Sequence, residues 1–232
     1  MLNSYQQKVI GIDYTNLIGF WDLGELTGTT ANDYSSRSNN GSFSGVTLDS
    51  ANAIDGKRTP SFDGINDFVN IYTGGFASDF NGAEGAVMVW IKVANVGVWT
   101  DGTTDYIFNA RVNNSNYIRI TKMSLNSTLI MSYVAGGTAQ SKTQNAFSYT
   151  GWLSIGISWS ATNDEVKFYV NNYLIDTQTG LGTWSGSLGA TTSVFGAFNI
   201  FGSIPWNGYL SSCAIWKDVL TESQMFEVSR VG

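Results

Sequence analysis

Few side chains in this sequence could perform acid–base, nucleophilic or metal chemistry. The chain contains no histidine and one cysteine, Cys213, which excludes histidine-based triads, histidine metal sites, an internal disulfide and thiolate zinc clusters. Retaining glycoside hydrolysis needs two carboxyl groups roughly 5–5.5 Å apart, and no Glu-x-Asp-x-Glu run is present. Asp164 and Glu165 lie in a polar turn, and Glu222 and Glu227 lie in a short terminal helix, so we interpret all four as solvated. The sequence predicts a protein that is not an enzyme and needs no cofactor.

Four oxygen-bearing side chains could hold a calcium ion, which takes six to eight oxygen ligands. They are Asp33, Asp63, Asn66 and Asp67. The competing interpretation, which we favour, is that Asp63-Gly64 and Asn66-Asp67 are turn residues that hydrogen-bond their own backbone. We therefore predict that folding needs no metal, because 232 residues with 43% apolar content can form a core unaided. A structural calcium ion is the disfavoured alternative.

Three tryptophans lie among glycine, threonine, serine and asparagine rather than within strand patterns: Trp99, Trp184 and Trp206. A loop tryptophan beside short polar groups suits sugar binding, since the ring stacks on the sugar while hydroxyl or amide groups bond to it. These loops contain Asp101 but no Lys or Arg, which favours a neutral glycan. The alternative is that the rings cap the protein's own core or pack against a neighbouring protein. If the protein binds sugar, we predict that these three rings make the contact.

The elements that must position these residues are strands and turns. Gly numbers 26 and Pro only 2, while aromatic residues make up 14% and charged residues 13%, which is typical of a sheet protein with many turns. About a dozen short strands at regular spacing predict an all-β, two-sheet antiparallel sandwich. Capping signals beginning at Ser4 and Thr221 predict a short helix near each terminus. We expect an N-terminal arm over residues 1–13 and one domain over residues 14–232.

The predicted N-terminal helix carries an apolar stripe formed by Leu2, Tyr5, Val9 and Ile10. Two interpretations stay open for this stripe. It could attach the protein to a partner, or it could cover a sheet edge of its own sandwich.

Charge and hydropathy exclude two partner classes. The net charge is −6 and no basic stretch is present, so nucleic acid is not expected as a partner. The longest apolar runs are short and interrupted, so no membrane span is expected. The N-terminus lacks the charged and apolar regions of a signal peptide, which predicts that the protein stays in the cytosol or leaves by lysis or a dedicated route.

Five ordered segments resemble the laminin G-like, concanavalin A-like jelly-roll family. Residues 20–33 (FWDLGELTGTTAND) are similar to its opening strand, and residues 61–69 (SFDGINDFV) to its next hairpin. The remaining segments are residues 86–92 (AVMVWIK), residues 151–174 around VKFYVNNYL, and residues 206–224 beginning WNGYLSSCAIW. The resemblance implies a jelly roll of two antiparallel sheets. Ser36 and Ser38 stand where the family commonly has glycine, which weakens the case for its calcium site.

The resemblance does not select one function, because this fold serves lectins, adhesins, enzyme-attached modules and virion parts. We first interpret the chain as a non-catalytic structural or surface protein of a bacteriophage virion, a capsid or tail decoration. The reason for this interpretation is that we expect a whole adhesion-type module beginning at Met1, with no export signal before it. Its expected partners are other virion subunits and host-surface glycans, and its location is the virion surface after assembly in the host cytoplasm. The alternative is a carbohydrate-binding, lectin-like module of a secreted adhesin or enzyme, extracellular or at the cell surface. Self-association is left open.

Overall fold

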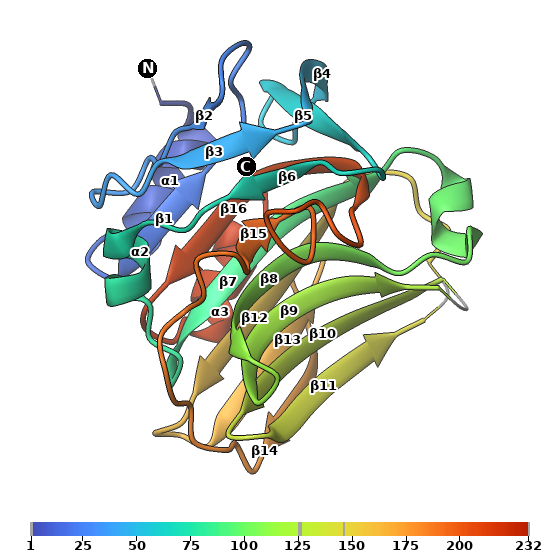
Figure 1. Cartoon of the computed structure of the whole chain (residues 1–232). Coiled ribbons are helices and arrows are strands. Elements are labelled where there is room, and N and C mark those ends of the chain that lie inside the picture. The colour runs from blue at the N-terminus through green and yellow to red at the C-terminus, as the bar shows by residue number, and fades with distance from the viewer. Residues whose placement is uncertain (1, 125–126, 146, 232) are drawn as a thin grey trace.

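A computed structural model describes residues 2–124, 127–145 and 147–231. Two antiparallel β-sheets pack face to face, and short helices lie near both termini (Figure 1). This arrangement confirms the predicted two-sheet sandwich. Among the residues described, no helix is long and apolar enough to cross a membrane.

The first sheet, sheet A, has the strand order β14-β13-β12-β7-β16-β5-β4, and β1 also pairs with β16. Its central strand is apolar on both faces, as the sequence predicts, since it lies between the core and a helical layer. The strands are β1 (Leu17–Trp21), β4 (Thr47–Asn52), β5 (Arg58–Asp63), β7 (Glu84–Val93), β12 (Leu153–Ser160), β13 (Glu165–Val170), β14 (Tyr173–Thr179) and β16 (Asn207–Trp216).

The second sheet, sheet B, has the strand order β11-β10-β9-β8-β15-β6-β3-β2. Strands β8 to β11 form a meander, whereas the strands paired on the other side come from distant parts of the chain. The strands are β2 (Thr30–Ala31), β3 (Gly41–Ser44), β6 (Phe68–Asn70), β8 (Asp105–Asn113), β9 (Asn116–Met123), β10 (Thr128–Ala135), β11 (Thr138–Gln144) and β15 (Ser193–Phe195).

The turns between these strands contain residues that tolerate a left-handed backbone conformation. Gly64 has φ +77° in the turn between β5 and β6, and Asn171 and Asn172 have φ +48° and +61° between β13 and β14. Glycine and asparagine tolerate this left-handed conformation better than other residues. The turns are those that the sequence predicts. Two further short helices, α2 (Gly74–Asp79) and η1 (Val96–Thr100), lie in connections.

Helices α1 (Ser4–Ile12) and α3 (Glu222–Val228) cover the outer face of sheet A. The Tyr5 hydroxyl donates to the Val228 carbonyl at 2.7 Å and accepts from the Trp90 indole N–H at 2.7 Å. Tyr5 and Val9 are buried in this layer, so the apolar stripe of the arm packs on a sheet face of its own domain rather than on an edge.

The two terminal helices differ in how closely their capping residues match those predicted from the sequence. Thr221 and Gln224 form a capping box as predicted. At the N-terminus the capping box uses Asn3 and Gln6, one residue earlier than the predicted Ser4. This correction has a physical reason, because Asn3 also donates to Asp55 at 2.7 Å and so is fixed by the domain.

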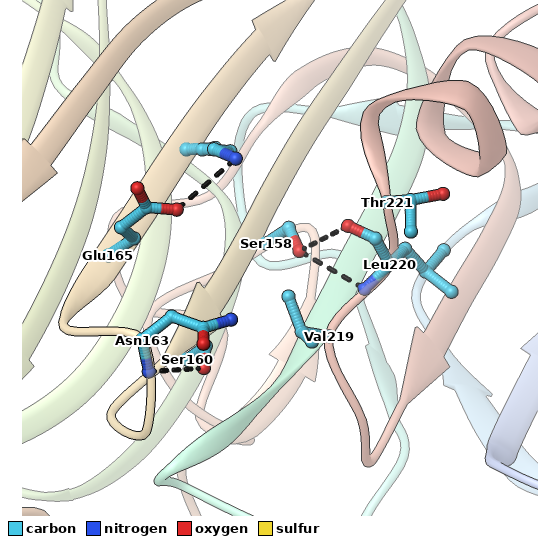
Figure 2. Close-up of a pocket in the computed structure, with 8 residues that line it drawn as sticks. Ser158, Ser160, Asn163, Glu165, Val219, Leu220 and Thr221 are labelled. Carbon is cyan, nitrogen blue, oxygen red and sulfur yellow. Dashed lines mark hydrogen bonds and ion pairs between the residues drawn. The ribbon is translucent and has the colours of Figure 1, made fainter.

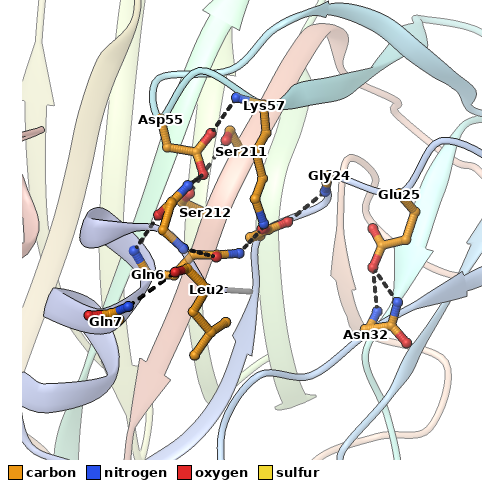
Figure 3. A network of polar contacts seen from close by, with 12 residues as sticks. Leu2, Gln6, Gln7, Gly24, Glu25, Asn32, Asp55, Lys57, Ser211 and Ser212 are labelled. Carbon is orange, nitrogen blue, oxygen red and sulfur yellow. Dashed lines mark hydrogen bonds and ion pairs between the residues drawn. The ribbon is translucent and has the colours of Figure 1, made fainter.

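A buried polar network also fastens α1 to the sandwich (Figure 3). Asp22 is buried, and its carboxylate accepts hydrogen bonds from the Gln6 amide, from the Gly24 N–H at 2.6 Å and from the Lys57 ammonium at 2.8 Å. These donors compensate the cost of burying a carboxylate. The network ties the helix, the loop after β1 and the turn before β5 together.

Candidate functional site

The three tryptophans predicted to contact sugar are not free platforms. Trp99 and Trp206 are 1% and 0% exposed and belong to the core between the sheets. Trp99 stacks on Phe147 with ring centroids 4.9 Å apart, and its N–H donates to the Tyr149 carbonyl at 2.9 Å. The rings of Trp99 and Trp206 thus close the core and present no exposed face. The reason is that a large apolar ring in a loop gains more by closing the core than by facing water.

Trp184 is partly buried against the same core. Its ring lies 5.8 Å from that of Phe80 and 6.2 Å from that of Tyr133, measured between centroids. Gly82 lies against the indole so closely that a Cβ there would come within 2.2 Å of it. Phe80, Gly82 and Tyr133 thus surround much of the ring. Glycan contact by the three tryptophans stays a prediction, one that would require the rings to leave these positions.

The three aspartates among the four candidate calcium ligands accept hydrogen bonds from backbone N–H groups. The Asp33 carboxylate accepts from the N–H groups of Phe20 at 2.8 Å and Asn39 at 2.7 Å. Asp63 accepts from the Ile65 N–H at 2.8 Å, and Asp67 accepts from the Asp63 N–H at 2.9 Å. The bonds of Asp63 and Asp67 confirm the turn interpretation for these two aspartates. In the described part of the chain, no group of three or more acidic, cysteine or histidine side chains could hold a metal ion.

We expect the melting temperature to be unchanged by a calcium chelator, because these carboxylates already have backbone partners. The measurement is thermal unfolding with EDTA, with excess calcium and with neither. A fall of several degrees in EDTA that added calcium reverses would contradict the prediction, and Asp33, Asp63, Asn66 and Asp67 would then be the ligands to test.

Two of the predicted loops do meet, and a hollow of about 290 Å³ lies between them. The segment after η1 brings one wall, and the segment before β16 brings the other. The Tyr106 N–H donates to the Ile204 carbonyl at 3.0 Å, and the Gly64 N–H donates to the Trp206 carbonyl at 3.1 Å, which fixes both walls. We call this site the end hollow; it is lined by Gly64, Asp101, Thr103, Thr104, Asp105, Ile204, Pro205 and Asn207.

An ion cluster around the buried Lys122 contributes Asp101, Thr103 and Asp105 to the wall of the end hollow. The Lys122 side chain is 0% exposed, and its ammonium lies 2.6 Å from Asp101 and 3.1 Å from Asp105. The Thr103 hydroxyl bonds to both carboxylates at 2.8 Å. Burial opposes ionisation of Asp101, but hydrogen bonds from Lys122 and Thr103 outweigh it and hold its pKa below the ordinary value. Burial raises the pKa of Asp105 despite the same partners. The sequence analysis did not identify Lys122 as a member of this cluster. Its only signal in the sequence is a lysine within a strand of alternating polar and apolar residues.

Exposed apolar side chains lie on the turns beside the end hollow. Ile65 is 71% exposed, Phe201 is 74% exposed and Ile204 is 42% exposed. Gly202 has φ +66°, and a Cβ there would come within 2.5 Å of the Asn66 carbonyl oxygen, so the two turns are in close contact. The region thus combines hydroxyl, amide and carboxylate groups with apolar surface, which is the usual composition of a small-ligand site.

A second hollow, of about 190 Å³, lies between β12, β13 and the segment before α3 (Figure 2). Ser158 and Ser160 both line it, and the Ser158 hydroxyl donates to the Leu220 carbonyl at 3.0 Å and accepts from the Leu220 N–H at 3.2 Å. The Lys167 ammonium lies 3.2 Å from Glu165 and 3.4 Å from Glu222. Burial alone would lower the pKa of Lys167, but these two carboxylates raise it. The arrangement fastens the C-terminal segment to the sheet.

The two antiparallel sheets, in which strands distant in the sequence pair side by side, form a jelly-roll sandwich of the concanavalin A-like class. The chain belongs to the concanavalin A-like lectin/glucanases superfamily, whose laminin G family model matches residues 62–225. A search of curated protein sequences found no match.

Solved structures with this fold include toxin binding domains and a domain of an extracellular arabinanase. The binding domain of botulinum neurotoxin serotype D is 15% identical with a TM-score of 0.66, and 93% of this chain covers 52% of that one. The binding domain of Paraclostridial Mosquitocidal Protein 1 is 16% identical with a TM-score of 0.68 and the same coverage. This chain thus spans about half the length of the toxin domains. Domain 4 of an extracellular arabinanase from Geobacillus stearothermophilus, in complex with arabinotriose, is 14% identical with a TM-score of 0.67, covering 93% and 98%.

Proposed function

We propose that the protein is a non-catalytic, lectin-like binding module that holds a saccharide in the end hollow. The observation that carries the proposal is the convergence of oxygen-bearing side chains with exposed apolar surface between two loops. Asp101 and Asp105 offer acceptors for sugar hydroxyls, Thr104 and Asn207 offer both donors and acceptors, and Ile204 offers apolar contact.

The similar proteins support a binding role. The arabinanase domain, which this chain resembles over almost its whole length, holds arabinotriose. A related toxin binding domain is in complex with the protein receptor synaptotagmin II. The absence of histidine and the engaged Ser158 support the non-catalytic part of the proposal.

The assignment to a bacteriophage virion stays a prediction. The toxin and arabinanase domains described above give it no support, and they favour an extracellular or cell-surface lectin instead. Co-sedimentation of the purified protein with phage particles lacking it would test the virion assignment, and absence of binding would count against it.

The saccharide proposal is tested with a polysaccharide and glycan array. We expect the wild type to bind and the double variant Thr104→Val, Asn207→Ala to bind at least about fivefold more weakly, since one lost hydrogen bond is worth about 1 kcal/mol. Thr47→Val is the matched control, because it removes an exposed threonine hydroxyl from β4, outside the end hollow.

Two results would count against the saccharide proposal. Retention of full affinity by the double variant would show that the saccharide binds outside the end hollow. No binding across the whole array would remove the lectin function itself. Melting temperatures within about 1 °C of the wild type would show that a loss of binding is not a loss of folding.

A further inference from the structure

The outer face of sheet B carries two arginines on neighbouring strands. Arg111 of β8 pairs directly with Tyr117 of β9, and Asn109 of β8 pairs with Arg119 of β9. Because side chains two residues apart in a strand share a face, Arg111 and Arg119 lie diagonally next to each other on one surface. Figure 1 shows β8 and β9 side by side in the meander of sheet B.

Aromatic rings hold both guanidinium groups in place. The Arg119 guanidinium lies 4.6 Å from the Tyr117 ring centroid and 5.9 Å from that of Tyr106, and it donates to the Tyr106 hydroxyl at 3.2 Å. The Arg111 guanidinium lies 5.2 Å from the ring centroid of Phe198, whose ring meets that of Tyr106 edge-on at 5.1 Å. The five side chains form one continuous surface, which we call the arginine face. Such stacking reduces the entropy that an arginine loses when it binds a ligand.

No carboxylate neutralises the arginine face. Among the described residues, Arg37 and Arg58 pair with Asp79 and Asp49, but neither Arg111 nor Arg119 has an acidic partner. The strands of sheet B contain a single acidic residue, Asp105, which pairs with Lys122. The chain as a whole has a net charge of −6, and these two positive charges lie together on one sheet face.

Arg119 also has hydrogen-bonding capacity that its own chain does not use. Its Nη1 donates to Tyr106, whereas its Nε–H is buried against its neighbours and has no acceptor in the described part of the chain. Beside it on the same face, Arg119 pairs with Ser132, and Ser132 pairs with Ser141. The hydroxyl of Ser141 donates to that of Ser132 at 2.9 Å. Ser132 is itself buried, so of this pair it is the Ser141 hydroxyl that is exposed beside the guanidinium.

We propose that the arginine face binds an acidic saccharide, a sugar chain that carries carboxylates. The planar guanidinium matches the planar carboxylate through two parallel hydrogen bonds. The exposed hydroxyl of Ser141 can bond to a hydroxyl of an adjoining sugar unit, and the rings offer apolar contact for its C–H surface. This site is separate from the end hollow and does not depend on it. A carboxylated saccharide also differs in charge from the neutral glycan that the composition of the tryptophan loops favours.

The test is affinity electrophoresis of the full chain in gels containing alginate, polygalacturonate or hyaluronan. Fully methyl-esterified polygalacturonate, heparin and poly-glutamate serve as comparison polymers. We expect retardation by at least one of the three carboxylated saccharides, and about tenfold or greater weakening of that binding in Arg111→Gln and in Arg119→Gln. Arg119→Lys should bind with intermediate affinity, because it keeps the charge and loses the planar fork.

The matched control is Arg58→Gln, which removes the same charge from an arginine already paired with Asp49. It should bind as the wild type does, and so should the double variant of the end hollow. No retardation by any carboxylated saccharide would overturn the proposal. So would equal binding of the methyl ester, preference for heparin or poly-glutamate, or unchanged binding in both arginine variants. Melting temperature verifies that each variant is folded.

Discussion

Replacing Lys122 with methionine should lower the free energy of unfolding by about 3–5 kcal/mol, because it leaves two carboxylates without the cation they share. The Lys122 side chain is 0% exposed and lies within 3.1 Å of both Asp101 and Asp105. For a domain of this size, such a loss corresponds to a fall of roughly 10 °C in melting temperature. The measurement is urea unfolding at pH 7, together with thermal unfolding.

The matched control is Lys142→Met, which removes a half-exposed ammonium 3.6 Å from Asp176. Its cost should be below about 1 kcal/mol, since surface ion pairs contribute little. Adding Asp105→Asn to Lys122→Met should restore part of the lost stability, because it removes the more buried of the two stranded charges. A Lys122→Met variant as stable as the control would show that the cluster is solvated and not part of the core.

The stability of the Lys122→Met variant should depend on pH in the opposite sense from that of a protein whose carboxylate pKa is lowered by an ion pair. Burial already raises the pKa of Asp105 in the wild type, and loss of Lys122 should raise it further. A carboxyl group whose pKa is higher in the folded than in the unfolded state binds its proton more tightly when folded. The stability deficit of Lys122→Met should therefore narrow as the pH falls from 7 towards 5. A deficit that widens over this range would contradict the assignment.

Deleting residues 1–12 should destabilise the domain by about 5 kcal/mol, because the deletion uncovers the outer face of sheet A. Tyr5 and Val9 are buried there, and each buried apolar side chain is worth about 1.5–3 kcal/mol. The deletion also removes the partner of the Trp90 indole and one of the three donors to the buried Asp22 carboxylate. Thermal unfolding should show a fall of more than about 10 °C.

The control for this deletion is Gln7→Ala, at an exposed position of the same helix, which should change stability by less than about 0.5 kcal/mol. An unchanged melting temperature in the deletion variant, combined with loss of binding to a partner, would show that the arm is an attachment segment. A fall in melting temperature without loss of partner binding would assign it to the domain's own outer layer.

Much of the fold could be predicted because its signals are local. The capping box at Thr221, the left-handed Gly64 turn and the Asn171–Asn172 hairpin each depend on backbone preferences within a few residues. The buried run 86–93 predicts a strand covered on both faces, as β7 is. The one-residue error at the first helix arose where the distant Asp55 influenced the choice of cap.

The candidate site was less accessible to sequence reasoning. The loops of Trp99 and Trp206 were identified correctly as neighbours of polar groups, and they do border the end hollow. Their rings nevertheless lie in the core, because ring burial depends on which apolar surface the loop can reach after the sheets have packed. The strand pattern containing Tyr117 and Arg119 signals a shared face, but no signal in the sequence joins them to Phe198.

The sequence by itself determined the class of this protein: an antiparallel sandwich without histidine, with one thiol and with turns fixed by Gly64, Asn171 and Asn172. These properties depend on composition and on short-range backbone energetics, which do not require knowledge of distant contacts. The tertiary structure alone decided that Lys122 is enclosed by two carboxylates and that Arg111 and Arg119 lack any acidic partner among the described residues. Whether a charge is buried, paired or free depends on the strands and loops that the fold brings beside it, and these come from widely separated parts of the chain.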